Sequence, residues 1–255
     1  MNLHIYETGK GRASYNMALD EALLEMQVAE KIPPVLRLYG WEPAAVTIGY
    51  TQDVEKDIDP AVCRRYGVQV VRRTTGGGAV FHDREVTYSL VAPVAALGES
   101  VPESFREVSK ALISGLEALG LKAVFAPLND ITVNDRKISG NAQVRRRGVL
   151  LQHGTILIGL DREKMFSLLR VPEEKTRKRN LARPEDRVTS LEEELGREVS
   201  FGEAAAAVRA GFAKWSGAEL PALEPPGELL ELAGRIEGGR FAAASWNMER
   251  IAVDV

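Results

Sequence analysis

The strongest constraint on the fold is a series of strand-like segments that follow one another between residues 121 and 160. They read LKAVFA, DITV, RKISGNAQ and GVLLQHGTILIGL, and only Asn134 and Asp135 separate the second from the third. So short a connection favours antiparallel neighbours, because parallel strands need a crossover of a dozen residues or more. The capping pair Ser100 and Glu103 precedes a run with helical period. The sequence therefore predicts an α+β fold with mostly antiparallel strands and interspersed helices, and disfavours a doubly wound fold.

Further elements are expected on both sides of this region. They are a helix over residues 17–31 capped within Ser14–Asn16, strands at 35–39, 46–49, 68–73 and 86–92, a helical segment at 161–170 and a helix from Ser200 to about Trp215. The proline-rich stretch LPALEPPGE, residues 220–228, predicts a linker, and the residues after it are too few for an independent core. We therefore expect one domain over residues 1–219, followed by a linker and extension over 220–255.

Composition excludes several functional classes. The 255 residues carry a formal net charge of -3, which argues against a dedicated nucleic-acid binder. One cysteine permits no internal disulfide, and three scattered histidines make a zinc site improbable. No apolar run approaches the roughly 20 residues that span a bilayer, and the N-terminus is too polar for a signal peptide. A cytoplasmic location without membrane contact is the expectation.

The stretch RRTTGGGAVFHD, residues 72–83, is the first candidate site. Three consecutive glycines let the backbone approach a ligand and turn its N–H groups toward an anion. Arg72 or Arg73 can bind a phosphate in bidentate fashion. The spacing is neither GxGxxG nor GxxxxGK[ST], which excludes the dinucleotide and P-loop motifs. A glycine-rich hairpin turn without a ligand is the alternative interpretation.

Two further segments contain candidate residues. In NDITVNDRKISGNAQ, residues 129–143, Lys137 beside small residues could hold a carboxylate and a phosphoryl oxygen together, and Asp130 could help to bind Mg²⁺. Taken alone, this segment is more typical of an exposed hairpin lysine and a turn aspartate than of a binding site. In QHGTIL, residues 152–157, His153 and Gly154 suggest close packing against a ligand or another backbone. A buried histidine satisfied by its neighbours is the commoner outcome.

Together, the three segments resemble one family, the lipoate–protein ligases, which belong to the wider biotin/lipoate ligase and octanoyltransferase superfamily. The likeness covers about residues 3 to 217, and NLARPEDRVTSL (180–191) resembles the segment that follows the catalytic motifs. The resemblance implies a mixed, largely antiparallel β-sheet flanked by helices, which is the biotin/lipoate ligase fold of the class II synthetase type. It also implies an enzyme that activates lipoate with ATP and Mg²⁺ to lipoyl-AMP. The lipoyl group would pass to a lysine of a lipoyl domain, in glycine cleavage H protein or a 2-oxoacid dehydrogenase E2.

The resemblance also assigns roles to residues of this chain, with Lys137 as the catalytic residue. The residues expected at ATP or the adenylate are Arg72, Arg73, Gly76, Gly77, Gly78, Ala79, Val80, Phe81, Asp130 and Lys137. Those expected at lipoate are Arg73, His82, Lys137, Ser139, Gly140, His153, Gly154 and Thr155. Asp130 is the expected Mg²⁺ ligand. Octanoate and lipoate present the same carboxylate, and a hydrophobic slot separates similar tails by only ~1–3 kcal/mol per methylene.

Octanoyltransferases and lipoyl amidotransferases of the superfamily are the main alternative, and they carry the acyl group on a cysteine. The only cysteine here, Cys63, lies upstream in DPAVCRRYG, in an expected amphipathic helix. Where the transferases closest in pattern have their cysteine, this chain reads FAPLND. The sequence therefore favours a ligase, with Cys63 as a small core residue.

Two other features bear on function. RFAAASWNMERIAVDV resembles the first stretch of the ligases' accessory domain, so a separate accessory subunit is a possible partner. The basic runs RRR (145–147) and KTRKR (175–179) could form a nucleic-acid surface on a catalytically dead scaffold. Negative net charge and the lack of interleaved aromatic residues favour a solvated face or a surface for an acidic lipoyl domain. Biotin ligation is disfavoured because the Gly-Arg-Gly-Arg loop of that family is missing.

Overall fold

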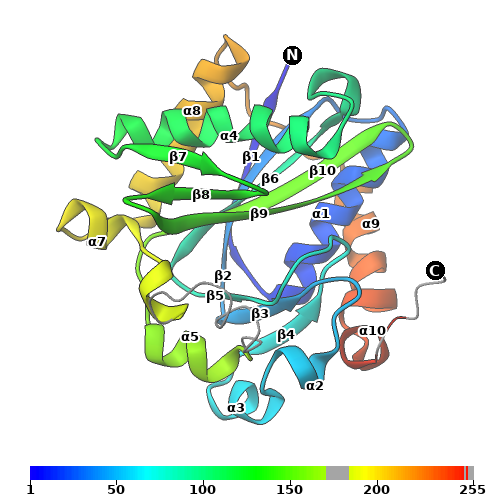
Figure 1. Cartoon of the computed structure of the whole chain (residues 1–255). Coiled ribbons are helices and arrows are strands. Elements are labelled where there is room, and N and C mark those ends of the chain that lie inside the picture. Colours follow the sequence, from blue (N-terminus) through cyan, green and yellow to red (C-terminus); the bar gives the residue numbers. More distant parts are fainter. Residues whose placement is uncertain (171–183, 250, 252–255) are drawn as a thin grey trace.

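The structure, a computed structural model, describes residues 1–170, 184–249 and 251. A seven-stranded sheet in the order β1-β2-β6-β10-β9-β8-β7 forms its centre (Figure 1). The strands are β1 (His4–Gly11), β2 (Val35–Trp41), β6 (Glu85–Pro93), β7 (Ala123–Ala126), β8 (Asp130–Val133), β9 (Arg136–Arg146) and β10 (Val149–Leu157). β1 and β2 pair in parallel, and the other neighbours pair antiparallel. The predicted α+β fold with a mixed, largely antiparallel sheet is confirmed.

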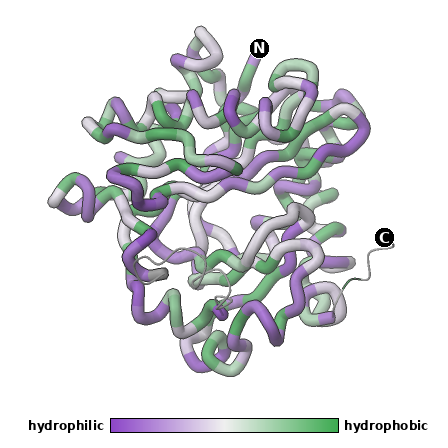
Figure 2. Tube along the Cα trace, viewed as in Figure 1, coloured by the Kyte–Doolittle hydropathy of each residue, from purple (hydrophilic) through white to green (hydrophobic). Residues whose placement is uncertain are grey.

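Helices cover both faces of this sheet. α4 (Val101–Ala118) and α8 (Phe201–Ser216) lie on one face, and α1 (Ala13–Val28) and α9 (Gly227–Ile236) lie on the other. Successive side chains of a strand point to opposite faces, so a strand covered twice must be apolar on both. In β10, Leu150 packs in the core shared with α4 and α8, whereas Leu151 packs in the core shared with α1 and α9. Hydrophobic residues accordingly recur along the strands and the helices that pack on them (Figure 2).

A second, three-stranded sheet in the order β4-β3-β5 lies below the large one in Figure 1. β3 (Ala45–Ile48) pairs in parallel with β4 (Gln69–Arg72) and antiparallel with β5 (Val80–His82). The parallel pair requires a crossover, which α2 (Val54–Asp57) and α3 (Pro60–Arg65) provide. The residues between β4 and β5, 73–79, are called the glycine loop below. The small sheet therefore places this loop opposite β9 and β10 of the large sheet.

The predicted capping residues are present at only some of the helix N-termini. At α4 the predicted capping box is present, with Ser100 and Glu103 bonded reciprocally. At α8 the Ser200 side chain caps the helix, but Glu203 pairs with Arg197 instead of completing the box. The expected cap of the first helix is wrong, because α1 begins at Ala13 after Arg12 with no side-chain cap. Tertiary contacts replace the cap: Ser14 donates to Glu237, and Asn16 bonds Arg37 and Gly40.

The segment expected to be a linker and extension packs on the rest of the chain. The amide of Ile5 donates to the carbonyl of Pro221 at 2.8 Å, and the amide of Leu223 donates to the carbonyl of Ile5 at 2.7 Å. Residues 221–223 therefore extend the sheet beyond β1. α9 then packs on α1, and α10 (Ala244–Met248) packs beside β4. The remaining described α-helices are α5 (Arg162–Leu168) and α7 (Leu191–Leu195). Among the described residues, no helix combines the length and the apolar character that crossing a membrane requires.

Candidate active site

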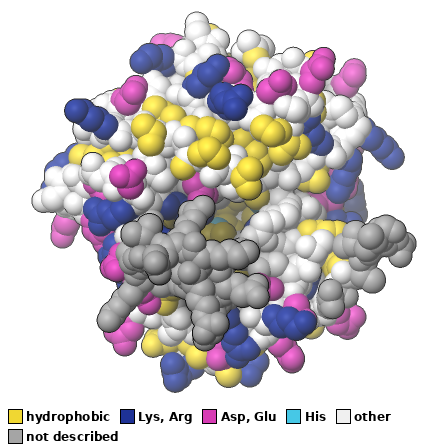
Figure 3. All heavy atoms as spheres, viewed as in Figure 1, with side chains coloured by type: hydrophobic (Ala, Val, Ile, Leu, Met, Phe, Trp, Pro, Cys, Tyr) yellow, Lys and Arg dark blue, Asp and Glu magenta, His cyan; other side chains and the backbone are white. Residues whose placement is uncertain are grey.

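A pocket lies between the glycine loop and the large sheet, and Figure 3 shows the hollow in this face of the molecule. The structure brings most of the predicted site residues to its wall. They are Arg73, Gly77, Gly78, Ala79, Val80, His82, Lys137, Gly140, His153, Gly154 and Thr155. The three motifs, which are far apart in the sequence, therefore meet at one site.

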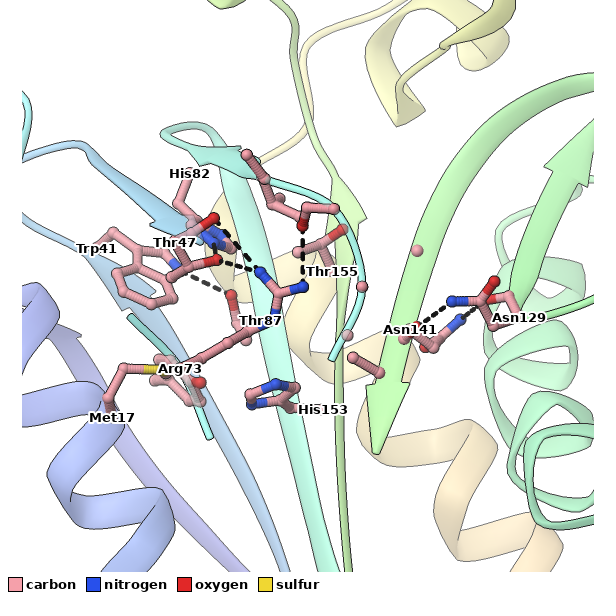
Figure 4. A pocket seen from close by; sticks show the side chains of 18 of the residues that line it. Met17, Trp41, Thr47, Arg73, His82, Thr87, Asn129, Asn141, His153 and Thr155 are labelled. Atoms are coloured by element: carbon pink, nitrogen blue, oxygen red, sulfur yellow. Dashed lines mark hydrogen bonds between the residues drawn. The ribbon is translucent and has the colours of Figure 1, made fainter. Parts of the chain in front are cut away.

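Arg73 is the centre of the loop side of the pocket (Figure 4). Its Nη2 donates to the carbonyl oxygens of Gly76 at 2.6 Å and Gly78 at 2.8 Å, which curls the glycine loop around the guanidinium. The backbone turn includes Gly77 at a φ of 97°, a left-handed conformation that favours glycine. Within the described residues, the amides of Gly76, Gly77 and Gly78 donate to no protein acceptor. These exposed N–H groups are free to bind an anion.

Two short hydrogen-bond chains start at Arg73. Its Nε donates to the hydroxyl of Thr75 at 3.0 Å, and that hydroxyl lies 2.8 Å from Nε2 of His153. Its Nη1 donates to the hydroxyl of Thr47 at 3.1 Å, which lies 2.8 Å from Nε2 of His82. Nδ1 of each histidine faces a carboxylate. A carboxylate only accepts, so each Nδ1 carries a proton, and the neutral form of each ring accepts from a threonine at Nε2.

These chains fix Arg73 without neutralising it. No carboxylate within the described residues forms an ion pair with Arg73, although its side chain is buried. Burial lowers the pKa of Arg73 to about 10, so the guanidinium remains charged at neutral pH. Buried charges are normally paired. An unpaired guanidinium on a pocket wall therefore indicates a site for an anionic ligand.

The carboxylate behind His153 is Asp20 of α1. Its oxygens lie 2.7 Å from Nη1 of Arg37, 2.9 Å from the hydroxyl of Tyr39 and 3.2 Å from Nδ1 of His153. Burial would raise the pKa of Asp20, but the hydrogen bond from His153 and the charge of Arg37 outweigh it and lower the pKa. Burial lowers the pKa of His153 despite its bond to Asp20. His153 is therefore neutral at pH 7, as the hydrogen-bond chain requires.

The carboxylate behind His82 is Glu85, which does not itself line the pocket. Its Oε1 accepts from Nδ1 of His82 at 2.7 Å, from the Thr87 hydroxyl at 2.6 Å and from Nε1 of Trp41 at 3.1 Å. The rings of Trp41 and His82 stack with centroids 4.1 Å apart. Both rings line the pocket, and their hydrogen bonds to Glu85 fix their orientation. They form an aromatic wall that suits an alkyl or dithiolane group.

Lys137 stands on the opposite wall, on β9. Ile131 faces Ser139 and Thr132 faces Lys137, so Ile138 is an extra residue that forms a bulge. Bulges re-aim side chains and are frequent beside active sites. The side chain of Lys137 is 43% exposed, and its Nζ lies 2.8 Å from Oδ1 of Asp130. A Cβ on Gly140 would lie 2.7 Å from that Nζ, so glycine leaves the space that the ammonium occupies.

Five predicted residues do not line the pocket. Arg72 points to the other side of β4, where its guanidinium donates to backbone carbonyls, and Phe81 packs in the core that contains Cys63. Strand alternation separates them from Arg73, Val80 and His82. Gly76 and Asp130 touch the site only through Arg73 and Lys137, and Ser139 is fully buried beside Asn141.

The sequence did not single out eight residues that line the pocket. They are Met17, Tyr39, Trp41, Thr47, Thr87, Asn129, Asn141 and Ala142. Asn129, Asn141 and Ala142 lie within the NDITVNDRKISGNAQ motif, so the candidate residues beside them were a usable signal. The rest come mainly from α1, β2, β3 and β6, and only the tertiary fold brings them to the pocket.

The pocket contains neither the cysteine nor a cluster of metal-binding side chains among the described residues. Cys63 is 1% exposed in the core of the small sheet, and burial raises its pKa to about 11. It does not line the pocket, which among its described lining residues contains no thiol. No three His, Cys, Asp or Glu side chains of the described residues gather as a metal site. The basic run at 175–179 and residues 180–183 lie outside the described residues.

Two cations that face each other across a pocket beside a glycine loop suit an enzyme that brings anionic groups together. The family model for the lipoyl protein ligase A/B catalytic domain matches residues 12–213, and the chain belongs to this family. Octanoyltransferase LipM from Kyrpidia tusciae is 38% identical over 96% of this chain and 98% of that protein. Octanoyltransferase LipM from Bacillus subtilis is 34% identical over 96% and 97%.

The solved structures that resemble this chain belong to the same superfamily. A bi-partite lipoate protein ligase from Thermoplasma acidophilum, studied with its E2 lipoyl domain, has a TM-score of 0.83 at 28% identity, covering 100% of this chain and 98% of that chain. A lipoate-protein ligase A bound with ATP has a TM-score of 0.81 at 27% identity, covering 97% and 98%. The predicted membership of the lipoate ligase and octanoyltransferase superfamily, and its fold, are confirmed.

Proposed function

We propose that this enzyme is an ATP-dependent lipoate–protein ligase that works through a non-covalent lipoyl-adenylate. The observation that carries this proposal is the position of its only cysteine. A thioester carrier must present a thiol to the substrate, and Cys63 is buried outside the pocket with a raised pKa. The pocket instead offers two cations and free loop amides, which suit a reaction between anions.

In the first half-reaction a lipoate oxygen attacks the α-phosphorus of ATP and pyrophosphate leaves. Two anions must approach, so cation placement is the main requirement. The N–H groups of Arg73 already donate within the protein, so Arg73 would attract the phosphates through its charge, while the amides of Gly77 and Gly78 would donate to phosphate oxygens. Lys137 would hold the carboxylate beside the α-phosphate. In the second half-reaction an acceptor lysine attacks the lipoyl carbonyl carbon, and AMP leaves. Neither step needs a nucleophile from the enzyme.

The residues present are compatible with a substrate-borne Mg²⁺ ion. Mg²⁺ is commonly held by one or two carboxylates together with substrate phosphates. Asp130 provides one partly exposed carboxylate beside Lys137, and the phosphates of ATP would supply further oxygens. When bound, the ion would neutralise charge on the phosphates. The expected acceptors are lipoyl domains of H protein or E2 type, and a cytoplasmic location is part of the proposal.

Lipoate-dependent exchange of pyrophosphate into ATP tests the first half-reaction. The purified chain with Mg²⁺ should catalyse exchange, the Cys63→Ala variant should retain it, and the Lys137→Ala variant should lose it. Exchange that disappears in Cys63→Ala with an unchanged fold would contradict the proposal. If the chain gives no exchange but lipoylates a lipoyl domain from supplied lipoyl-AMP, adenylation requires an accessory subunit.

Octanoyl transfer is the second candidate, because relatives at 34–38% identity bear the name octanoyltransferase LipM. Without a pocket thiol, the acceptor lysine would have to attack the bound octanoyl thioester directly. The distinguishing assay supplies octanoyl-acyl carrier protein and a lipoyl domain without ATP. Octanoylated product in this assay, together with no pyrophosphate exchange, would replace the ligase proposal with this one.

A further inference from the structure

The segment around Trp246 and Asn247 covers the outer edge of β4. Nε1 of Trp246 donates to the carbonyl of Arg72, and Oδ1 of Asn247 accepts from the amide of Arg72, both at 2.9 Å. β4 is an edge strand of the small sheet, so its outer backbone groups lack a neighbouring strand. Two side chains thus take the place of a strand at the residue that precedes the glycine loop.

The side chain of Arg72 connects this segment to the residues that follow β3. Its guanidinium donates to the carbonyls of Trp246 and Glu249 at 2.9 and 2.8 Å. On the other side it donates to the carbonyls of Tyr50 and Gln52 at 2.9 and 2.7 Å. The planar fork of arginine allows one side chain to hold both segments.

The segment after β3 in turn contacts the glycine loop. The amide of Tyr50 donates to the carbonyl of Thr75 at 2.9 Å. A Cβ on Gly49 would overlap the carbonyl oxygen of Gly77, so the two backbones are in direct contact. The ring of Tyr50 also packs on Trp246, with centroids 5.9 Å apart. A continuous set of contacts therefore leads from Trp246 to the loop that forms the pocket wall.

We propose that Arg72, Trp246 and Asn247 are positioning residues that hold the glycine loop in its ligand-binding shape. None of the three lines the pocket. They act through the backbone of β4 and through the segment after β3. The structural part of this inference is independent of the reaction, whereas its kinetic part rests on the proposed ligase function.

Amide hydrogen exchange in the free protein tests the structural part. Trp246→Phe keeps an aromatic ring at this position and removes the hydrogen bond from Nε1 to the carbonyl of Arg72. The matched control is Trp215→Phe, which removes the bond from Nε1 of Trp215 to Glu107 at 3.0 Å, on the helices beyond the large sheet. The amides of Tyr50 and Arg73 should exchange roughly fivefold faster in Trp246→Phe only, as expected for one lost hydrogen bond. Equal exchange rates in both variants would overturn the proposal.

A second pair of variants separates positioning from general stability. Asn247→Ala removes both the acceptor for the amide of Arg72 and the donor to the carbonyl of Phe241, whereas Asn247→Asp keeps the acceptor and loses only the donor. In pyrophosphate exchange, Asn247→Ala should raise the KM for ATP about fivefold with a smaller change in kcat, and Asn247→Asp should recover part of that loss. Equal KM values for Asn247→Ala and wild type would contradict the inference. If the wild type shows no pyrophosphate exchange, the ligase proposal fails, while faster amide exchange in Trp246→Phe still supports the positioning role.

Discussion

The two cations of the pocket, Arg73 and Lys137, are held in opposite ways. Arg73 is buried and donates to two loop carbonyls and two threonine hydroxyls, so its position is determined by the fold. Lys137 is about half exposed, and within the described residues its one ion-pair partner is Asp130. A fixed cation can shape a binding loop, whereas a cation with one exchangeable partner can move with the substrate. The comparison predicts that Arg73 supports structure and binding together, and that Lys137 supports chemistry almost alone.

Replacing Lys137 by alanine should give the largest effect. The loss of one cation at the developing charge should reduce kcat about 10²- to 10³-fold, by analogy with a lost oxyanion donor. The free energy of unfolding should stay within about 0.5 kcal/mol of wild type, because an exposed ion pair contributes little. Pyrophosphate exchange and urea denaturation measure the two quantities. A variant that is markedly less stable would remove the distinction between the two cations.

Replacing Arg73 by methionine should reduce both the activity and the free energy of unfolding. The threonine hydroxyls and loop carbonyls lose their donor, and unsatisfied buried groups cost about 1–3 kcal/mol each. We expect a loss of about 2–3 kcal/mol in unfolding free energy, together with loss of ATP binding. Urea denaturation and nucleotide titration measure these losses. Arg73→Lys should recover little, because an ammonium cannot reproduce the guanidinium fork. Wild-type stability in Arg73→Met would show that the guanidinium does not hold the loop.

Gly140→Ala tests the space beside Lys137. The added Cβ would lie 2.7 Å from the ammonium and displace it, but the exposed side chain can move away at little cost to folding. Misplacement of a reacting group is costly, and we expect about a tenfold loss in kcat with a near-normal melting temperature. Gly120→Ala is unsuitable as a control because of its φ of 88°, whereas a Cβ on Gly202 would make only an ordinary contact, 3.9 Å from Oγ of Ser200. Equal activities of Gly140→Ala and Gly202→Ala would contradict this account.

The smallest expected effect is a pH dependence on the Arg73 side. The pKa of His153 in the folded protein is below its ordinary 6.5, so the unfolded state binds the extra proton as pH falls. The contribution of His153 to the free energy of unfolding is fully present above pH 6.5. It declines as the pH is lowered from 6.5 toward the pKa of His153 in the folded protein. His153→Gln should show a shallower decline in unfolding free energy between pH 7 and 5. Parallel curves for the two proteins would contradict the neutral form assigned to His153.

The sequence predicted the fold better than the details of the site. Short connections between apolar segments predicted the antiparallel run from β7 to β10, and the capping pair at Ser100 marked α4 correctly. Adjacent residues of one motif were harder to separate. Arg72 and Arg73 point to opposite sides of the backbone, and which side faces a pocket depends on the packing of the whole small sheet. Thr47 and Glu85 had no motif of their own, because their role arises from partners distant in sequence.

The pairing of Ile5 with residues 221–223 has a consequence for biosynthesis. β1 leaves the ribosome among the first segments, yet the residues that cover its outer edge are synthesised about two hundred positions later. Until then the edge has unpaired backbone groups, and α1 lacks the cover of α9. Contacts between such distant segments fold slowly, and exposed strand edges promote association with other chains. The edge of the sheet at β1 therefore stays open until residues 221–223 have been synthesised, and a chaperone that binds extended segments would act at this stage.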